Sequence, residues 1–202
     1  MNDVRGVLWD VGNVIVRWDP RTLYSKIFPD PAERDRFLGE VCTMVWHFSH
    51  DCGVSFADNR IDLLERYPQH REAILAWETR WWEMFSGAIP ETEAAIEALA
   101  ERGAPQVALT NMSHETWEGT FAMSPAFARL KDKVVSGLDG VAKPGEAIFR
   151  LAAERAGLPA EQLLFVDDSA TNIRAADALG FKTHLFADPK ALWPALQAAG
   201  LL

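Results

Sequence analysis

Val7-Leu8-Trp9-Asp10-Val11-Gly12-Asn13 is an apolar segment of strand length that ends in an acid and runs into a glycine turn. Asp10 is therefore expected at the carboxyl end of a strand, held by the sheet and directed out of its edge. In open α/β sheets, ligands bind at that edge. A carboxylate placed there serves as a nucleophile or as a metal ligand, so both roles need partners elsewhere in the chain.

Five apolar runs have the length of strands, and the best of them are apolar throughout rather than at alternate positions. This pattern is typical of strands buried on both faces of a parallel sheet. The runs are Val4–Trp9, Gln106–Leu109, Lys133–Val135, Leu163–Val166 and Lys182–Phe186. Alternating with them are amphipathic helical stretches that each end at a glycine, namely Glu91–Arg102, Gly145–Ala156 and Ala170–Leu179. The alternation predicts the α/β class with a doubly wound parallel sheet.

The stretch from about Asp19 to Ser86 contains no clear strand, and we expect it to be helical. Its predicted helices are Pro31–Val45, Ser55–Glu65 and Arg71–Phe85. Aromatic side chains repeat along the last of these at spacings of four, at Trp77, Trp81 and Phe85, with Trp82 beside them. The repeat favours a packed core over an exposed binding surface. We predict that residues 19–86 form a helical cap inserted into a core of residues 1–18 and 87–202.

The composition excludes several classes of partner. The 202 residues carry a formal net charge of -9 and 49% of them are hydrophobic, which allows a sizeable core but no basic surface for nucleic acid or anionic membranes. Cys42 and Cys52 match no metal or redox spacing and are expected to be reduced thiols. No signal peptide or membrane-spanning run is visible, so a cytoplasmic location is expected, whereas the oligomeric state is not indicated.

Four segments that follow or adjoin predicted strands carry candidate chemistry: Asp10–Asn13, Leu109–Ser113, Val141–Pro144 and Phe165–Asn172. Asp10 and Asp167, with the adjacent Asp168, are a set of carboxylates that suits Mg²⁺. Thr110 and backbone N–H groups at a helix start are natural phosphate ligands. Lys143 can neutralise phosphate oxygens and restrain Asp10. Asp10 could then attack phosphorus in line and form an aspartyl-phosphate that water cleaves.

In this order, the four segments resemble the haloacid dehalogenase superfamily over the whole chain, and most closely its phosphatase branch that includes bacterial α-D-glucose-1-phosphate phosphatase. The resemblance implies a Rossmann-like core, a helical C1-type cap and a Mg²⁺ cofactor. By position, it makes Asp10 the nucleophile and places Thr110, Lys143 and Asp167 in the second, third and fourth motifs. We predict a Mg²⁺-dependent phosphohydrolase acting on a small phosphorylated metabolite, with a sugar 1-phosphate as one candidate.

The predicted site residues fall into three groups. The catalytic residues are Asp10, Thr110 and Lys143, and the substrate-binding residues are Thr110, Asn111 and Lys143. The metal ligands are Asp10, the Gly12 backbone carbonyl, Asp167 and Asp168. Asn111 would contact phosphate or brace its turn, and a structural role is favoured for Asn172.

Gly12 is the departure from this pattern. Most phosphatases of the superfamily carry a second aspartate two residues after the nucleophile, where it acts as general acid and base. Losing such a group costs roughly 10²–10⁴-fold in rate. Either another group protonates the leaving oxygen or the substrate has a good leaving group. The alternatives are a dehalogenase, which the paired acids of the fourth motif disfavour, and a catalytically impaired phosphometabolite-binding sensor.

Four side chains are candidates for the missing acid: His47, His50, His114 and Asp19. His47 and His50 flank a Phe-Ser pair close in sequence to Cys52–Ser55, a loop that lies where C1-capped relatives place their substrate-specificity loop. For all three histidines, packing or surface roles are the favoured interpretation. Asp19 lies near the expected hinge into the cap.

Overall fold

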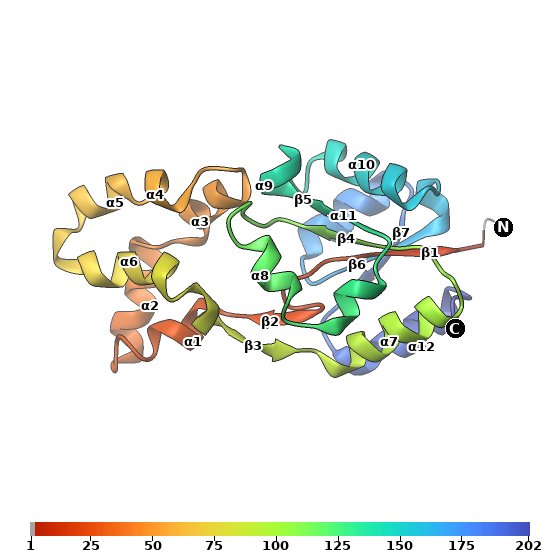
Figure 1. Cartoon of the computed structure of the whole chain (residues 1–202), viewed down its shortest axis with the longest axis horizontal. Helices are drawn as coiled ribbons and strands as arrows, with labels where there is room; N and C mark the ends of the chain where they lie inside the picture. Colours follow the sequence, from red (N-terminus) through yellow and green to blue (C-terminus); the bar gives the residue numbers. More distant parts are fainter. Residues whose placement is uncertain (1–2) are drawn as a thin grey trace.

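The computed structural model describes residues 3–202 and has a parallel sheet of five strands in the order β5-β4-β1-β6-β7 (Figure 1). The strands are β1 (Gly6–Trp9), β4 (Gln106–Thr110), β5 (Asp132–Val135), β6 (Leu163–Asp167) and β7 (Lys182–Leu185). Each coincides with one of the five predicted apolar runs. The predicted doubly wound α/β class is confirmed.

Helices cover both faces of this sheet (Figure 1). α7 (Pro90–Glu101) and α12 (Leu192–Ala198) pack on one face, and α10 (Glu146–Ala156) and α11 (Ala170–Ala178) pack on the other. The short helices α8 (Trp117–Phe121) and α9 (Ser136–Asp139) follow β4 and β5. The three predicted core helices are therefore present. α10 ends at Gly157, whose φ of 73° is the left-handed conformation that glycine adopts most readily.

The central strand β1 is buried on both faces, which explains its continuous apolar pattern. Val7 and Trp9 pack into the cluster with α7 and α12, whereas Leu8 packs into the cluster with α10. The indole N–H of Trp9 donates to the side chain of Gln106 at 2.9 Å. The only polar atom of this tryptophan side chain is therefore paired, and the strand is held rigidly up to its carboxyl end.

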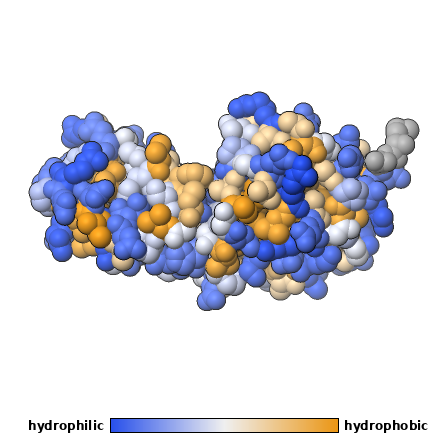
Figure 2. Space-filling view, turned by 90° about the horizontal axis from the view of Figure 1, so that it is seen from above, coloured by the Kyte–Doolittle hydropathy of each residue, from blue (hydrophilic) through white to orange (hydrophobic). Residues whose placement is uncertain are grey.

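Between β2 (Val16–Trp18) and β3 (Phe85–Ala88) the chain is helical, and we call residues 20–84 the helical lobe. Its helices are α1 (Pro20–Tyr24), α2 (Pro31–Glu40), α3 (Met44–Asp51), α4 (Phe56–Asn59), α5 (Ile61–Arg66) and α6 (Arg71–Thr79). They enclose a hydrophobic cluster of their own that includes Tyr24, Phe37 and Trp77. Figures 1 and 2 show this lobe beside the sheet-containing part, with an indentation of the outline between them.

The boundaries predicted within this stretch were partly wrong. The first predicted helix stops at Glu40, because Thr43 caps a new helix by accepting a hydrogen bond from the Trp46 N–H at 3.1 Å. The second predicted helix is divided at Arg60 into α4 and α5.

The third predicted helix was also wrong in its second half. α6 ends at Thr79, a 3-10 turn follows, and β3 begins at Phe85. The stretch therefore does contain strand residues. Trp77 and Trp81 are buried as expected, but Trp82 is 46% exposed. Its ring lies over Gly119 of α8, where a Cβ would overlap it.

Among the described residues, no helix combines the length and the apolar character needed to span a bilayer. Cys42 and Cys52 are both free thiols, the first buried and the second exposed.

Candidate active site

The carboxyl ends of three neighbouring strands bring the predicted residues together. β1 lies between β4 and β6, with Trp9 opposite Ala108 on one side and Val166 on the other. The residues that follow are therefore side by side at one edge of the sheet. Asp10 is fixed there by its N–H, which donates to the carbonyl of Val166 at 2.9 Å.

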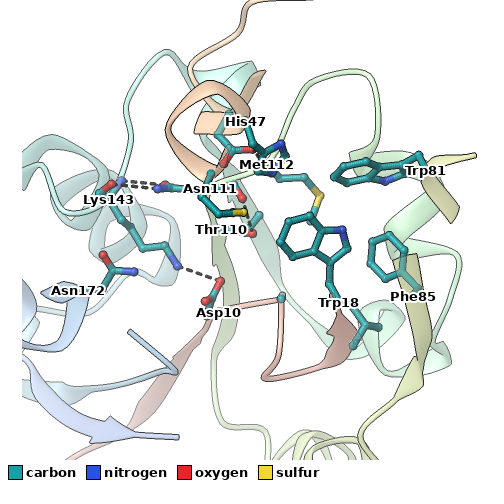
Figure 3. A pocket seen from close by; sticks show the side chains of 14 residues that line it. Asp10, Trp18, His47, Trp81, Phe85, Thr110, Asn111, Met112, Lys143 and Asn172 are labelled. Carbon is teal, nitrogen blue, oxygen red and sulfur yellow. Dashed lines mark hydrogen bonds and ion pairs between the residues drawn. The ribbon is translucent and has the colours of Figure 1, made fainter. Parts of the chain in front are cut away.

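Lys143 joins the first and fourth motifs. Its Nζ lies 2.9 Å from Asp10 Oδ1 and 2.7 Å from Asp167 Oδ2, and it donates to the carbonyl of Leu109 at 2.9 Å. The lysine is 2% exposed and Asp167 is fully buried. Residues from three elements therefore contact one buried ammonium group, and Figure 3 shows the predicted pairing of Lys143 with Asp10.

The electrostatics follow from this burial. Burial raises the pKa of Asp10, Lys143 opposes that effect, and the nearby Asp167 and Asp168 add to it. For Lys143, burial alone would lower the pKa, but attraction to Asp10 and Asp167 outweighs it and the pKa is raised. The lysine therefore keeps its proton, and the carboxylates repel one another.

This cluster fits a divalent cation. Oxygen atoms of Asp10, Asp167 and Asp168 all lie within 4.8 Å of one another. When all three are ionised, Lys143 balances one charge and leaves two uncompensated, which a hard divalent ion with oxygen ligands such as Mg²⁺ relieves. The three carboxylates are among the predicted metal ligands, and metal binding by them and by the Gly12 carbonyl stays a prediction.

Two asparagines support the charged residues through hydrogen bonds. The side-chain amide of Asn111 donates to the Lys143 carbonyl at 2.9 Å and accepts from the Lys143 N–H at 2.8 Å. Both ends of this amide are therefore used to hold the Lys143 backbone. Asn172 donates to both oxygens of Asp167 at 3.1 Å, and Ser169 N–H donates to the same carboxylate at 2.7 Å. Asn172 thus orients Asp167, in agreement with its expected structural role.

Gly12 lies at the predicted position beside Asp10. Apart from its two chain neighbours, no residue has an atom within 4 Å of where its Cβ would be, and its φ lies outside the left-handed region. The backbone here would therefore accept a side chain, although none is present. The turn is completed by Asn13, whose φ of 57° is left-handed and whose side chain accepts from the Trp18 N–H at 3.0 Å.

A cavity of about 190 Å³ lies over these residues (Figure 3). From the sheet edge and the loops beside it come Asp10, Gly12, Thr110, Asn111, Met112, Lys143 and Asn172. From β2, the helical lobe and β3 come Val16, Trp18, Met44, His47, Asp51, Trp81 and Phe85. The cavity is therefore polar and charged at the sheet edge, and mainly aromatic and apolar on the opposite wall.

Of the four predicted substitutes for the missing acid, only His47 lines this cavity. Burial lowers the pKa of His47 to about 3, and its ring stacks on Trp18 with centroids 5.2 Å apart. His50 is fully buried next to Asn59, and His114 is exposed. Asp19 caps α1 by accepting from the Arg21 N–H.

Asp51 is a cavity residue that the sequence reasoning missed. It ends α3, is 7% exposed, and has its pKa raised to about 7 by burial, with Lys143 acting in the opposite direction. An available signal was its place four residues after His47, on the same helical face and next to the loop singled out for specificity. Acids on helices are usually exposed, so the pattern alone did not indicate burial.

A family profile described as haloacid dehalogenase-like hydrolase matches residues 4–180. The mouse (Mus musculus) acyl-CoA dehydrogenase family member 10 is 31% identical over 102 residues, which is 50% of this chain and 9% of that protein. The chain thus corresponds to a small part of this curated relative.

Solved structures share the fold at low sequence identity. A haloacid dehalogenase (HAD) family enzyme from Bacteroides thetaiotaomicron, in complex with magnesium and inorganic phosphate, has 19% identity and a TM-score of 0.66, covering 94% of this chain and 99% of that one. A HAD-like family hydrolase from Porphyromonas gingivalis has 21% identity and a TM-score of 0.71, covering 96% and 97%. An L-2-haloacid dehalogenase has 21% identity and a TM-score of 0.68, covering 96% and 99%.

Proposed function

Because this chain belongs to the haloacid dehalogenase-like hydrolases, we propose that it is a Mg²⁺-dependent phosphohydrolase that cleaves a small phosphate ester. The observation that carries the proposal is the cluster of Asp10, Asp167 and Asp168 beside a cavity that Asp10 and Lys143 line, with Lys143 paired to Asp10 and Asp167. A carbon-centred dehalogenation needs no such set of acids, whereas phosphate with a divalent ion requires it.

In the proposed reaction, a carboxylate oxygen of Asp10 attacks phosphorus in line with the ester oxygen. Lys143 and the Thr110 hydroxyl bind the phosphoryl oxygens, and Asn111 holds the Lys143 backbone in register. Mg²⁺, held by Asp10, the Gly12 carbonyl, Asp167 and Asp168, would supply charge neutralisation at the phosphoryl group. Water then cleaves the aspartyl-phosphate and restores Asp10.

We further propose that the helical lobe acts as a cap, with residues 19–86 forming that cap and residues 1–18 and 87–202 the core. Its support is that the lobe contributes four residues to the cavity wall, namely Met44, His47, Asp51 and Trp81. A closed cap would exclude water and select the leaving group.

The cavity lining also bears on the substrate. Lys143 is the sole lysine or arginine among the described residues that line it, and that cation already faces Asp10. The opposite wall is built from Trp18, Trp81 and Phe85. These features favour a compact leaving group without a second anionic group. A sugar 1-phosphate stays a candidate because its leaving group needs little protonation, in line with the resemblance to the glucose-1-phosphate phosphatase branch.

The test is hydrolysis of para-nitrophenyl phosphate with and without Mg²⁺, followed by a panel of sugar 1-phosphates, acyl phosphates and plain monoesters. We expect Mg²⁺-dependent turnover that Asp10→Asn abolishes while the thermal unfolding curve stays cooperative. Folded protein without turnover would favour the phosphometabolite-binding sensor. Halide release from a 2-haloacid without added metal would favour the dehalogenase reaction, which Gly12 leaves open.

A further inference from the structure

Cleavage of a phosphate monoester leaves a negative charge on the departing oxygen, which must be protonated unless the alcohol is acidic. Gly12 offers no proton at the position beside Asp10. The cavity wall opposite the sheet edge contains one carboxyl group, that of Asp51 at the end of α3. Asp10, Gly12 and Asp51 line the same cavity, so a substrate bound at Asp10 occupies a cavity that also contains Asp51.

Asp51 is held in place from the sheet side of the cavity. The hydroxyl of Ser136, which follows β5, donates to the Asp51 carbonyl at 2.6 Å. The same hydroxyl accepts from the Met112 N–H at 2.9 Å, two residues after Thr110. The Asp51 backbone is therefore connected by two hydrogen bonds to the loop that carries the second motif, and Ser136 is a positioning residue for it.

The carboxyl group of Asp51 itself has little to bind. Among the described residues, its nearest basic partner is His47, whose Nε2 lies 3.8 Å from Oδ1, beyond hydrogen-bonding distance. A buried carboxyl group with free hydrogen-bonding capacity beside a cavity is available to a ligand oxygen.

We propose that Asp51 is the general acid and base of the reaction, supplied by the helical lobe in place of the side chain that Gly12 lacks. The inference rests on the proposed phosphohydrolase function. As the bond from Asp10 to phosphorus forms and the ester P–O bond breaks, the Asp51 carboxyl proton passes to the leaving oxygen and yields the alcohol. In the second step the Asp51 carboxylate takes a proton from the attacking water. The P–O bond to Asp10 then breaks, which releases orthophosphate, and Asp51 is protonated again.

The environment of Asp51 allows its carboxyl group both to donate and to accept a proton near neutral pH. The titratable groups around it are His47 and His50 on α3, the Cys52 thiol and Lys143 across the cavity. Burial lowers the pKa values of His47 and His50 to about 3 and about 4, so neither imidazole is charged near neutrality. Burial raises the pKa of Asp51 to about 7, and both of its protonation states are therefore populated at that pH. His47 is neutral at that pH and therefore has no imidazolium proton to donate.

The test compares Asp51→Asn with the wild type on two Mg²⁺-supplemented substrates, para-nitrophenyl phosphate and benzyl phosphate. Nitrophenol leaves without protonation, whereas benzyl alcohol does not. In the first turnover, measured by rapid quench, we expect Asp51→Asn to lose roughly 10²–10⁴-fold on benzyl phosphate and less than about 10-fold on the nitrophenyl ester. The burst of nitrophenol should persist while the steady rate falls, because the second step also needs the base.

Three comparisons keep the outcomes apart. Asp62→Asn, an exposed acid of α5, is the matched control and should leave both substrates unaffected. Asp51→Glu should recover part of the benzyl phosphate rate, and circular dichroism checks that each variant is folded. Equal losses on both substrates in the first turnover would overturn the role of Asp51. Wild-type protein that hydrolyses neither substrate would overturn the phosphohydrolase function instead.

Discussion

Gly12 has open space at the position of a Cβ and a φ outside the left-handed region, so an aspartate can be introduced there. We expect Gly12→Asp in the Asp51→Asn background to raise the first-turnover rate on benzyl phosphate by at least about 10-fold, because general acid catalysis is worth roughly 10²–10⁴-fold. The measurement is rapid-quench kinetics with saturating Mg²⁺.

Gly12→Asn in the same background is the isosteric control, since it fills the space but has no acidic proton. Equal rates for the Asp and Asn variants would mean that proton transfer does not limit this step. A faster rate with Gly12→Asp but not with Gly12→Asn would show that the Asp51→Asn protein lacks a proton donor. It would also show that the phosphate is still correctly placed in that protein.

Replacing Lys143 should reduce both the stability of the fold and the turnover. It is 2% exposed and pairs with Asp10 and Asp167, so Lys143→Met leaves buried carboxylates without a cation. Removing one partner of a buried ion pair typically costs about 3–5 kcal/mol. We expect that loss in urea unfolding without metal, together with loss of turnover.

Added Mg²⁺ should raise the thermal midpoint of Lys143→Met more than that of the wild type, because the uncompensated charge is larger. Lys133→Met, which removes a lysine from a strand at the sheet edge, is the control and should respond to Mg²⁺ as the wild type does. A Lys143→Met protein as stable as the wild type would contradict the assignment of Lys143 as the buried counter-charge.

At the scale of elements, α3 carries a stability cost that its proposed function explains. Burial raises the pKa of Asp51 to about 7. A carboxyl group with a raised pKa stabilises the folded state below its unfolded pKa of about 3.9, and this contribution is lost as the pH rises through about 7. The ionised form in this pocket then costs up to about 4 kcal/mol.

Asp51→Asn should therefore be more stable than the wild type at pH 8, by about 2–4 kcal/mol, and the advantage should vanish near pH 4. Urea unfolding at several pH values measures it. The two neighbouring histidines titrate in both proteins, so their contribution cancels in the difference. Asp62→Asn should show no such trend, and a variant that is less stable at pH 8 would contradict the buried environment assigned to Asp51.

The elements differ in how well the sequence predicts them. Strands such as β1 and β6 are buried on both faces, which leaves a continuous apolar pattern that can be recognised without a structure. β2 and β3 were missed because they have only three and four residues and pair with each other across the whole helical lobe. Their stability comes from tertiary pairing, to which local propensity contributes little.

The residues of the candidate site likewise differ in how well the sequence predicts them. Asp10, Lys143 and Asp167 were predicted to meet because parallel strands align their carboxyl ends, and the structure brings them together. Their chemical roles stay predictions. Asp51 could not be predicted in the same way, since only the placement of α3 over the sheet edge buries it.

At the scale of the whole molecule, Trp18 of β2 packs on aromatic rings of the helical lobe, but few side-chain hydrogen bonds join the lobe to the rest of the described chain across the cavity. Besides the Ser136 contact and the Trp82 ring over Gly119, the described residues include a hydrogen bond from the Phe56 N–H to the Glu115 carboxylate at 2.7 Å. The β2–β3 ribbon forms the covalent connection (Figure 1). Such a sparse interface is what a lobe that opens and closes requires.

Glu115 lies outside the cavity, so its removal should affect closure rather than chemistry. A hydrogen bond to a charged group is worth about 1.5–3 kcal/mol, and less where it is exposed. We expect Glu115→Ala to raise KM for benzyl phosphate by roughly 5-fold with little change in the first-turnover rate at saturation, which corresponds to about 1 kcal/mol. Hydrogen exchange at the Phe56 amide should become faster.

Glu118→Ala, an exposed acid on α8 without such a contact, is the control. If Glu115→Ala lowered the saturated rate instead and left KM unchanged, the contact would act on the chemical step, and the lobe would not be acting as a cap.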